Sequence, residues 1–283
     1  MRGFTAENLN GKRFLRLHYS ADEEKTKAWA EEKRASEADP RNWDKQMEMR
    51  RVVTDGIPVF ARYNDAKHCP KYTYDDYLPL IDGSIYFMGW DAGQTLSPAA
   101  LLRGLTPDLM VRDLLEVVSI TGESMEEFAP RVQTLLGEIY PSIINQIRHH
   151  GDATITTRSG PNKVTAQQVA LRYGFDIKAE TNDWSKRKSA IDLILNLGLP
   201  DNPMYVVSGK GCPVLRRGYQ GMYKYKIGAQ GENQGAGAIV LAPLKNGYSH
   251  IQDAGQYCGL PIFDLLKPKT GSGKTFRSKG GYA

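Results

Sequence analysis

The chain has 283 residues, of which 41% are hydrophobic, so it is long enough to bury a substantial core in one large domain or two small ones. Its apolar runs fall far short of the roughly 18 residues that a membrane span needs, and its start has no apolar signal core. We therefore expect a cytoplasmic protein without a membrane partner. The three cysteines lack any C-x-x-C pairing, which indicates neither a disulfide framework nor a zinc knuckle.

The formal net charge of +5, from 37 basic and 32 acidic residues, is unevenly distributed. Residues 266–283 carry five basic residues and no acid, so the rest of the chain is formally neutral. Within that neutral part, residues 153–226 hold 12 basic residues against 5 acidic ones. A local excess of this kind suits a polyanion such as DNA, because neutralised phosphates release counterions, although a solvated surface remains the alternative.

Residues 1–78 are predicted to form a charged, largely helical connector segment, because they contain few apolar residues. Acidic and basic residues alternate over 21–34, which predicts an exposed helix, and a second helix is expected over 42–51. Trp29 and Trp43 should pack this pair of helices against a larger body.

Residues 79–265 are expected to form one α/β domain. Its first part predicts a meander of three strands over 81–90, 99–105 and 110–120, followed by a helix over 123–140 and a buried strand over 143–147. Helices over 165–173 and 184–197 then alternate with strands over 176–179 and 204–207. This order describes a ribonuclease H-like mixed sheet, in which an antiparallel meander is joined by parallel strands and helices cover both faces.

The end of the chain combines Gly-rich segments with one helix. A β-hairpin is expected after Tyr219 and a mobile loop over 228–237, and a helix should run from Ser249 to about Leu260. Residues 266–283 are expected to be a basic flexible tail. The sequence T-G-S-G-K-T in this tail resembles a phosphate-binding loop, but Pro268 occupies the position of the first glycine, and we reject that reading.

Three aspartates are the candidate catalytic residues and metal ligands. Asp91 and Asp152 each follow an apolar run where a strand would give way to a turn, and Asp253 should lie in the first turn of the last helix, three residues after His250. Carboxylates that converge from the ends of such elements suit two Mg²⁺ or Mn²⁺ ions that cleave phosphodiesters. His250 would bind metal, donate to a phosphate or orient water.

Each of these residues also has a structural interpretation. Asp91 before Ala92-Gly93 and Asp152 after Gly151 fit turns, and Asp253 fits a helix-start acid with Ser249 as the N-cap. Two further observations limit the site. Glu116 is a plausible outer member of it, but a solvated strand face is the commoner place for both Asp113 and Glu116. The adjacent His149 and His150 should point to opposite faces of a strand, which excludes them as a metal-ligand pair.

Four segments together resemble the nuclease half of the large terminase subunit of tailed bacteriophages. They are G-W-D-A-G, G-D-A-T, C-P-V-L-R-R-G-Y-Q-G-M-Y-K-Y-K and K-N-G-Y-S-H-I-Q-D-A-G-Q-Y. The resemblance implies a ribonuclease H-like fold and a nuclease that cuts concatemeric viral DNA with two divalent metals. It places Asp91, Asp152 and Asp253 at the metal-ligand positions and His250 at the active-site histidine.

The resemblance also implies partners and departs from the family in two places. Double-stranded DNA, an ATPase motor, a small terminase subunit and a portal would be the partners, in the host cytoplasm. Ala153-Thr154 replace the usual residues after the second acid, so Asp152 is the least secure ligand. No Walker motif precedes Leu15, so either the chain is a nuclease encoded or prepared separately, or the motor lies on another polypeptide.

The leading hypothesis is therefore a metal-dependent endonuclease that acts on duplex DNA with little sequence preference. Phosphate contacts that position the duplex would come from Lys186, Arg187, Lys188, Arg216, Arg217, Lys224 and Lys226. Two alternatives stay open: a ribonuclease H-like structure-specific resolvase, and a non-catalytic module that binds DNA or docks on the portal.

Overall fold

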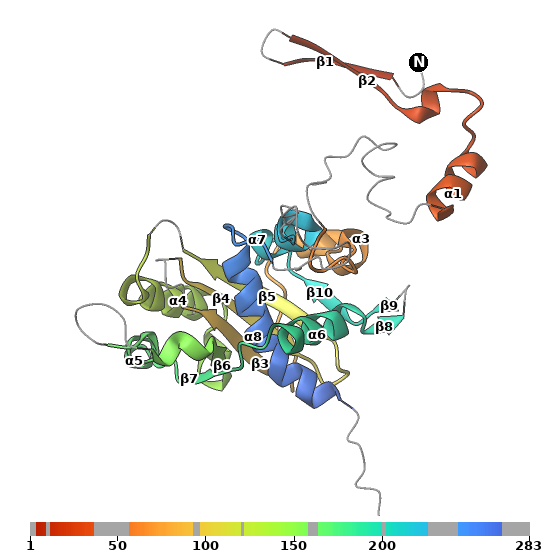
Figure 1. Ribbon diagram of the computed structural model, residues 1–283. Coiled ribbons are helices and arrows are strands. Elements are labelled where there is room, and N and C mark those ends of the chain that lie inside the picture. The colour runs from red at the N-terminus through yellow and green to blue at the C-terminus, as the bar shows by residue number, and fades with distance from the viewer. Residues whose placement is uncertain are drawn as a thin grey trace, which may run out of the picture.

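The computed structural model describes residues 4–9, 12–36, 57–92, 97–119, 122–157, 164–199, 202–225 and 243–267 (Figure 1). Several predictions lie outside these residues. They concern the helix over 42–51 with Trp43, the turn at Gly93, Lys226, the loop over 228–237 and the tail beyond residue 267.

A six-stranded mixed sheet organises the domain, in the order β10-β5-β4-β3-β6-β7. Strands β3, β4 and β5 form an antiparallel meander, while β6 pairs parallel to β3, β7 parallel to β6, and β10 parallel to β5. The predicted ribonuclease H-like α/β sheet is therefore confirmed. The strands are β3 (Ile85–Asp91), β4 (Ala99–Leu105), β5 (Val111–Val118), β6 (Arg148–Gly151), β7 (Ile177–Ala179) and β10 (Tyr205–Val207).

Helices cover both faces of this sheet, as predicted (Figure 1). Alternate residues of β3 point to opposite faces, so Trp90 packs with Phe128 and Val169 while Phe87 packs with Ile191 and Ala254. The first face is covered by α4 (Met125–Ile139) and α5 (Ala166–Arg172), and the second by α6 (Trp184–Leu195) and α8 (Ser249–Leu266). None of the helices among the described residues has the length and apolar character to cross a membrane.

The remaining elements are short. They are β1 (Phe4–Leu9), β2 (Lys12–Leu17), α1 (Lys27–Ser36), α3 (Asp65–His68), β8 (Gly198–Leu199), β9 (Asn202–Pro203), α7 (Pro213–Arg217) and the 3-10 turns η1 (Tyr19–Ala21), η2 (Lys71–Thr73), η3 (Pro141–Gln146) and η4 (Ala153–Thr156).

Three predicted elements differ from the structure. In the segment expected to be largely helical, residues 4–17 contain an antiparallel ribbon of β1 and β2, which precedes α1. The strand expected over 143–147 is the 3-10 turn η3, since Pro141 occupies its first position and the strand begins only at Arg148. The hairpin expected after Tyr219 is a π-helical turn, η5 (Gly218–Met222), in which Gly221 has a φ of 114°.

Helix α8 lies in unusually close contact with β3. A Cβ added at Gly89 would come within 1.8 Å of the carbonyl oxygen of Ala254 and 3.0 Å of the nitrogen of Cys258. Any side chain at residue 89 would therefore push the helix away from the sheet. Gly89, the first residue of G-W-D-A-G, therefore sets the distance between the strand that ends at Asp91 and the helix that carries Asp253.

A buried ion pair ties the same helix to the centre of the sheet. Arg103 on β4 donates from Nε to Asp113 on β5 at 2.5 Å and from Nη1 to the carbonyl oxygen of Gly255 on α8 at 2.9 Å. The hydroxyl of Tyr205 donates to the other carboxylate oxygen at 2.5 Å. The prediction that Asp113 lies on a solvated face is therefore wrong, because both charged side chains are fully buried.

Glu116 is also placed differently from the prediction of an outer member of the metal site. Its carboxylate accepts from the backbone nitrogens of Val214 at 2.6 Å and Leu215 at 2.7 Å, so it caps the start of α7. Burial raises its pKa to about 7, although these two backbone donors lower it. Its role is to hold α7 on β5.

Replacing Gly89 with alanine should destabilise the protein by about 1–3 kcal/mol, the usual cost of overpacking a tight contact. A matched control is Gly137→Ala in α4, where an added Cβ would meet nothing within 4 Å and helix propensity favours alanine. Chemical denaturation of both variants measures the difference. Equal stability of the two variants would contradict the close approach.

Replacing Asp113 with asparagine should cost about 3–5 kcal/mol, because Arg103 would remain buried without a counter-charge. The exposed pair formed by Asp264 and Lys267 provides the control, and Asp264→Asn should leave the midpoint of thermal unfolding nearly unchanged. Similar midpoints for the two variants would show that the buried pair contributes little.

Candidate active site

Asp91 and Asp152 leave the sheet at the same edge. Asp91 is the last residue of β3, and Asp152 directly follows β6, the parallel neighbour of that strand. Trp90 is opposite Gly151 in the register, and the backbone nitrogen of Asp152 donates to the carbonyl oxygen of Trp90 at 3.2 Å. The carboxyl ends of two parallel strands therefore bring these acids together although they are distant in sequence.

Asp253 reaches this edge from α8. The predicted helix start at Ser249 is confirmed, but the N-cap residue is Tyr248 and the helix extends to Leu266, past Pro261. Asp253 is therefore in the second turn and not the first, so the helix dipole favours its charge less than expected. Ala254, the next residue, is the one that contacts Gly89, so the Asp253 side chain lies beside the end of β3.

His250 joins Asp91 directly. Its Nδ1 lies 2.9 Å from Oδ2 of Asp91, and this hydrogen bond raises the pKa of His250 despite the opposing effect of burial. The charges of Asp91 and Asp253 raise it further, while that of Lys245 lowers it. With Nδ1 held by Asp91, Nε2 is the ring nitrogen left to contact a substrate or water.

Asp253 is nearly inaccessible, with 4% of the residue exposed, and two cationic side chains contact its carboxylate. The Nζ of Lys245 donates to Oδ2, and Nη1 of Arg187 lies 3.4 Å from Oδ1. Burial raises the pKa of Asp253, Lys245 and Arg187 lower it, and the charge of Asp91 raises it. The structure thus places Asp91 and Asp253 within electrostatic reach of each other.

Tyr257 on α8 connects Arg187 to Asn182 through its hydroxyl. Burial raises the pKa of its hydroxyl, Arg187 lowers it, and the charges of Asp152, Asp253 and Asp91 each raise it again. The hydroxyl accepts from Nη1 of Arg187 at 2.9 Å and donates to Oδ1 of Asn182 at 3.1 Å. Strand pairing places Asp91 and Asp152 at one end of the sheet, and the hydrogen bond between Asp91 and His250 places Asp91 beside the start of α8.

Asp152 has a structural role in addition to its position. It is the N-cap of η4, and its carboxylate accepts from the backbone nitrogen of Thr154 at 2.9 Å and from Oγ1 of Thr154 at 2.7 Å. The turn interpretation is correct, and Thr154, which departs from the family pattern, is the residue that orients this acid. Each carboxylate oxygen keeps a further lone pair for another ligand.

The donor chemistry of the site fits a hard divalent cation, since its acids offer only oxygen ligands. The described residues nevertheless contain no group of three or more His, Cys, Asp or Glu side chains already arranged to hold a metal ion. The contacts of Asp253 give a physical reason, because Lys245 and Arg187 occupy its carboxylate. Lys245 is 66% exposed, so its amine can return to water when a bound cation takes its place at the buried carboxylate.

The predicted phosphate contacts divide into several groups. Arg187 is turned into the site, and Lys188 pairs with Asp192 on its own helix at 2.5 Å. Arg216 is held by Asp65, with the shorter contact at 2.5 Å, and lies over the Tyr74 ring. Lys186 and Arg217 are exposed and Lys224 is partly exposed, as phosphate contacts require.

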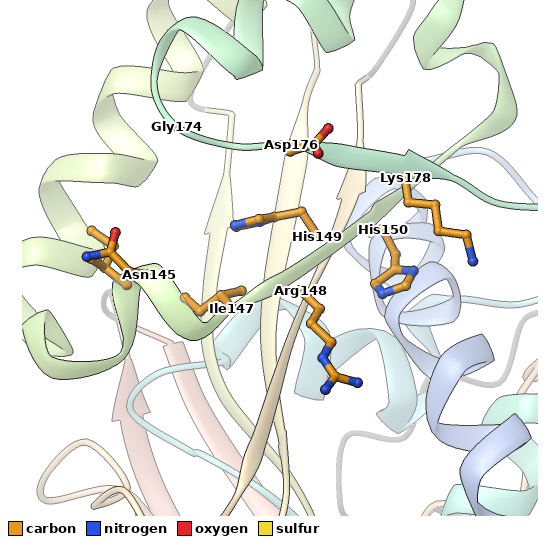
Figure 2. A pocket seen from close by; sticks show the side chains of 9 residues that line it. Asn145, Ile147, Arg148, His149, His150, Gly174, Asp176 and Lys178 are labelled. Carbon is orange, nitrogen blue, oxygen red and sulfur yellow. The ribbon is translucent and has the colours of Figure 1, made fainter.

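His149 and His150 point to opposite faces of β6, as predicted (Figure 2). His149 accepts from Nε1 of Trp90 at 3.1 Å, and its burial lowers its pKa to about 4. His150 pairs with Glu180 at 2.9 Å. A groove of about 470 Å³ beside them is lined by Arg148, Asp176 and Lys178, among others, and includes none of the three aspartates.

Sequence reasoning missed several residues of the site. Lys245 and Tyr223 lie in segments that carry the resemblance but were assigned no role, and Asn182 has no recognisable signal. The Tyr223 hydroxyl lies 3.5 Å from Oδ1 of Asp253. Tyr257 does have one, because it follows Asp253 by four residues and therefore shares its helix face.

Comparison with known proteins gives structural matches alone. No protein-family model matches the chain, and neither does any curated protein. The large terminase of a thermophilic bacteriophage matches with a TM-score of 0.51 and 14% identity, over 82% of this chain and 52% of that one. The chain therefore spans about half the length of that large terminase.

Two nuclease-domain structures match with lower scores. The P22 large terminase nuclease domain has a TM-score of 0.47 and 12% identity, over 74% of this chain and 97% of that domain. The large terminase nuclease of the thermophilic phage G20c, solved with bound cobalt, has a TM-score of 0.43 and 14% identity, over 73% and 98%. The resemblance drawn from the sequence motifs is thus confirmed as a likeness of fold, carried by the match to the longer large terminase with the TM-score of 0.51.

Proposed function

We propose that this chain is a divalent-metal-dependent DNA endonuclease of a phage terminase, which cuts concatemeric viral DNA during genome packaging. The observation that carries the proposal is the placement of the elements that bear the three acids, at one end of the mixed sheet. Asp91 and Asp152 end neighbouring parallel strands, and Asp253 is held beside them by the contact of α8 with Gly89. The likeness of fold to the large terminase of a thermophilic bacteriophage supports the same proposal.

The proposed metal ligands are Asp91, Asp152 and Asp253, and the proposed ions are Mg²⁺ or Mn²⁺. Such ions, when bound in a pair, lower the pKa of an attacking water and stabilise the departing oxygen of a phosphodiester. The chain itself supplies the arrangement of the ligands. Thr154 orients Asp152, His250 orients Asp91, and Nε2 of His250 is available to the water or the phosphate.

The proposed partner at the site is double-stranded DNA. Lys186, Arg217 and Lys224 are the described basic residues placed to contact its phosphates, and such contacts position a duplex without reading its sequence. An ATPase motor, a small terminase subunit and a portal are proposed as further partners, in the host cytoplasm.

One observation favours a second candidate, a non-catalytic module that binds DNA or docks on the portal. Both carboxylate oxygens of Asp253 are contacted by cations, so the acid is neutralised within the protein. Such a module would bind DNA in a salt-sensitive manner and release no cleavage products in any divalent ion. A plasmid-nicking assay with Mn²⁺ separates the two functions, and a comparison of branched with linear DNA tests the resolvase alternative.

Replacing Asp91 or Asp253 with asparagine should reduce plasmid nicking by more than about 100-fold, because charge stabilisation by a bound metal is worth several kcal/mol. Circular dichroism should show that both variants keep the fold. Asp264→Asn, an exposed acid at the far end of α8, provides the control. Full activity in both site variants would eliminate the proposed site.

Replacing Lys245 with methionine should tighten Mn²⁺ binding about two- to fivefold, since it removes the solvent-exposed amine that competes with the metal for the buried Asp253 carboxylate, a gain of about 1 kcal/mol. Calorimetric titration without DNA measures this affinity, and Lys71→Met is the matched control on an exposed lysine. Weaker binding in the Lys245 variant would mean that this lysine supports the metal rather than competing with it.

A further inference from the structure

Arg187 differs from the two lysines beside it on α6. Lys186 is exposed and Lys188 pairs with Asp192, so both remain on the outer side of their helix. Arg187 instead extends to α8, where its side chain is only 11% exposed. One residue of this basic run therefore belongs to the interior of the site.

The guanidinium is held in place by aromatic side chains. Its Nη1 donates to the hydroxyl of Tyr257 at 2.9 Å, and its carbon lies 4.9 Å from the centre of the Tyr257 ring and 5.8 Å from that of Trp184. Asn182 fixes the tyrosine in turn by accepting from its hydroxyl. Cation–π contacts of this kind orient an arginine without neutralising it.

The contact of Arg187 with Asp253 is comparatively loose. At 3.4 Å it is longer than the roughly 2.7–2.9 Å of a charge-assisted hydrogen bond. The Nε of Arg187 is buried and has no hydrogen-bond partner among the described residues. A buried donor on a charged group is costly to leave unsatisfied, so the arrangement indicates a missing anionic partner.

We propose that Arg187 binds a non-bridging oxygen of the phosphate that is cleaved, an inference that rests on the proposed nuclease function. The fork of donors on a guanidinium matches the oxygens of a phosphate and is weakly hydrated, so it tolerates a buried site. Arg187 is thereby distinguished from the surface lysines, which contact phosphates elsewhere along the duplex. The alternative role is that Arg187 only positions Asp253.

The test compares Arg187→Ala and Arg187→Lys with Arg172→Ala, an exposed arginine on α5, in the full chain. Single-turnover cleavage would be measured on duplex DNA and on bis(p-nitrophenyl) phosphate, a diester that offers no further phosphates to the protein. Calorimetry with Mn²⁺ alone would report metal affinity, and circular dichroism the fold.

We expect Arg187→Ala to slow cleavage of both substrates by about 10²–10³-fold, as the loss of one donor to a developing anion does elsewhere. Its Mn²⁺ affinity should not fall, because Arg187 approaches the Asp253 carboxylate only at 3.4 Å and as a competing cation. Arg187→Lys should recover part of the rate, since a lysine restores the charge and not the fork. If Arg187→Ala does not fold, the cleavage rate and the Mn²⁺ affinity of Arg187→Lys test the inference instead.

Three results would overturn the inference. Weakened Mn²⁺ binding with a rate restored by saturating Mn²⁺ would make Arg187 a positioning residue for Asp253. If the cleavage rate falls on DNA but not on the small diester, Arg187 contacts a phosphate distant from the cleaved one. Unchanged rates on both substrates would leave it without a role in the reaction. Failure of the unaltered chain to cleave either substrate would instead overturn the proposed function, and this inference with it.

Discussion

The close contact between α8 and β3 determines the geometry of the site. With no side chain at Gly89, the backbone of the helix lies directly on the strand, and Asp253 comes beside the strand end that carries Asp91. Arg103 secures the same helix from the centre of the sheet through its bond to the carbonyl of Gly255. A glycine and a buried ion pair, neither of which touches a substrate, thus bring together acids that are far apart in sequence.

The sequence predicted the core of the fold because its signals there are local. The strand over 99–105 matches β4, and the amphipathic run that ends before Pro141 matches α4. The errors arose where tertiary contacts decide. The apolar run over 143–147 is a 3-10 turn after a proline. In the Gly- and Tyr-rich stretch expected to form a hairpin, Tyr219 and Tyr223 pack their rings against Phe60, and residues 218–222 form a π-helical turn.

The acidic residues of the site could be predicted from the sequence, but the cationic side chains that contact them could not. Aspartates at the ends of strands follow from sequence pattern and topology, whereas the approach of Lys245 and Arg187 to Asp253 depends on how α6 and α8 pack. The burial of Asp113 was missed for the same reason, since its partner Arg103 lies on another strand. A charged residue in a strand is predicted to face solvent unless the sequence also indicates which residue of opposite charge pairs with it. These cations now define the central question, which is whether the three acids can accept a metal.

The most direct measurement is a crystal structure of the protein soaked in Mn²⁺, with anomalous scattering used to locate the ions. The account predicts manganese bound by Asp91, Asp152 and Asp253 together, with the amine of Lys245 moved away from the Asp253 carboxylate. Manganese bound at other residues, or absent while Lys245 still contacts Asp253, would contradict it.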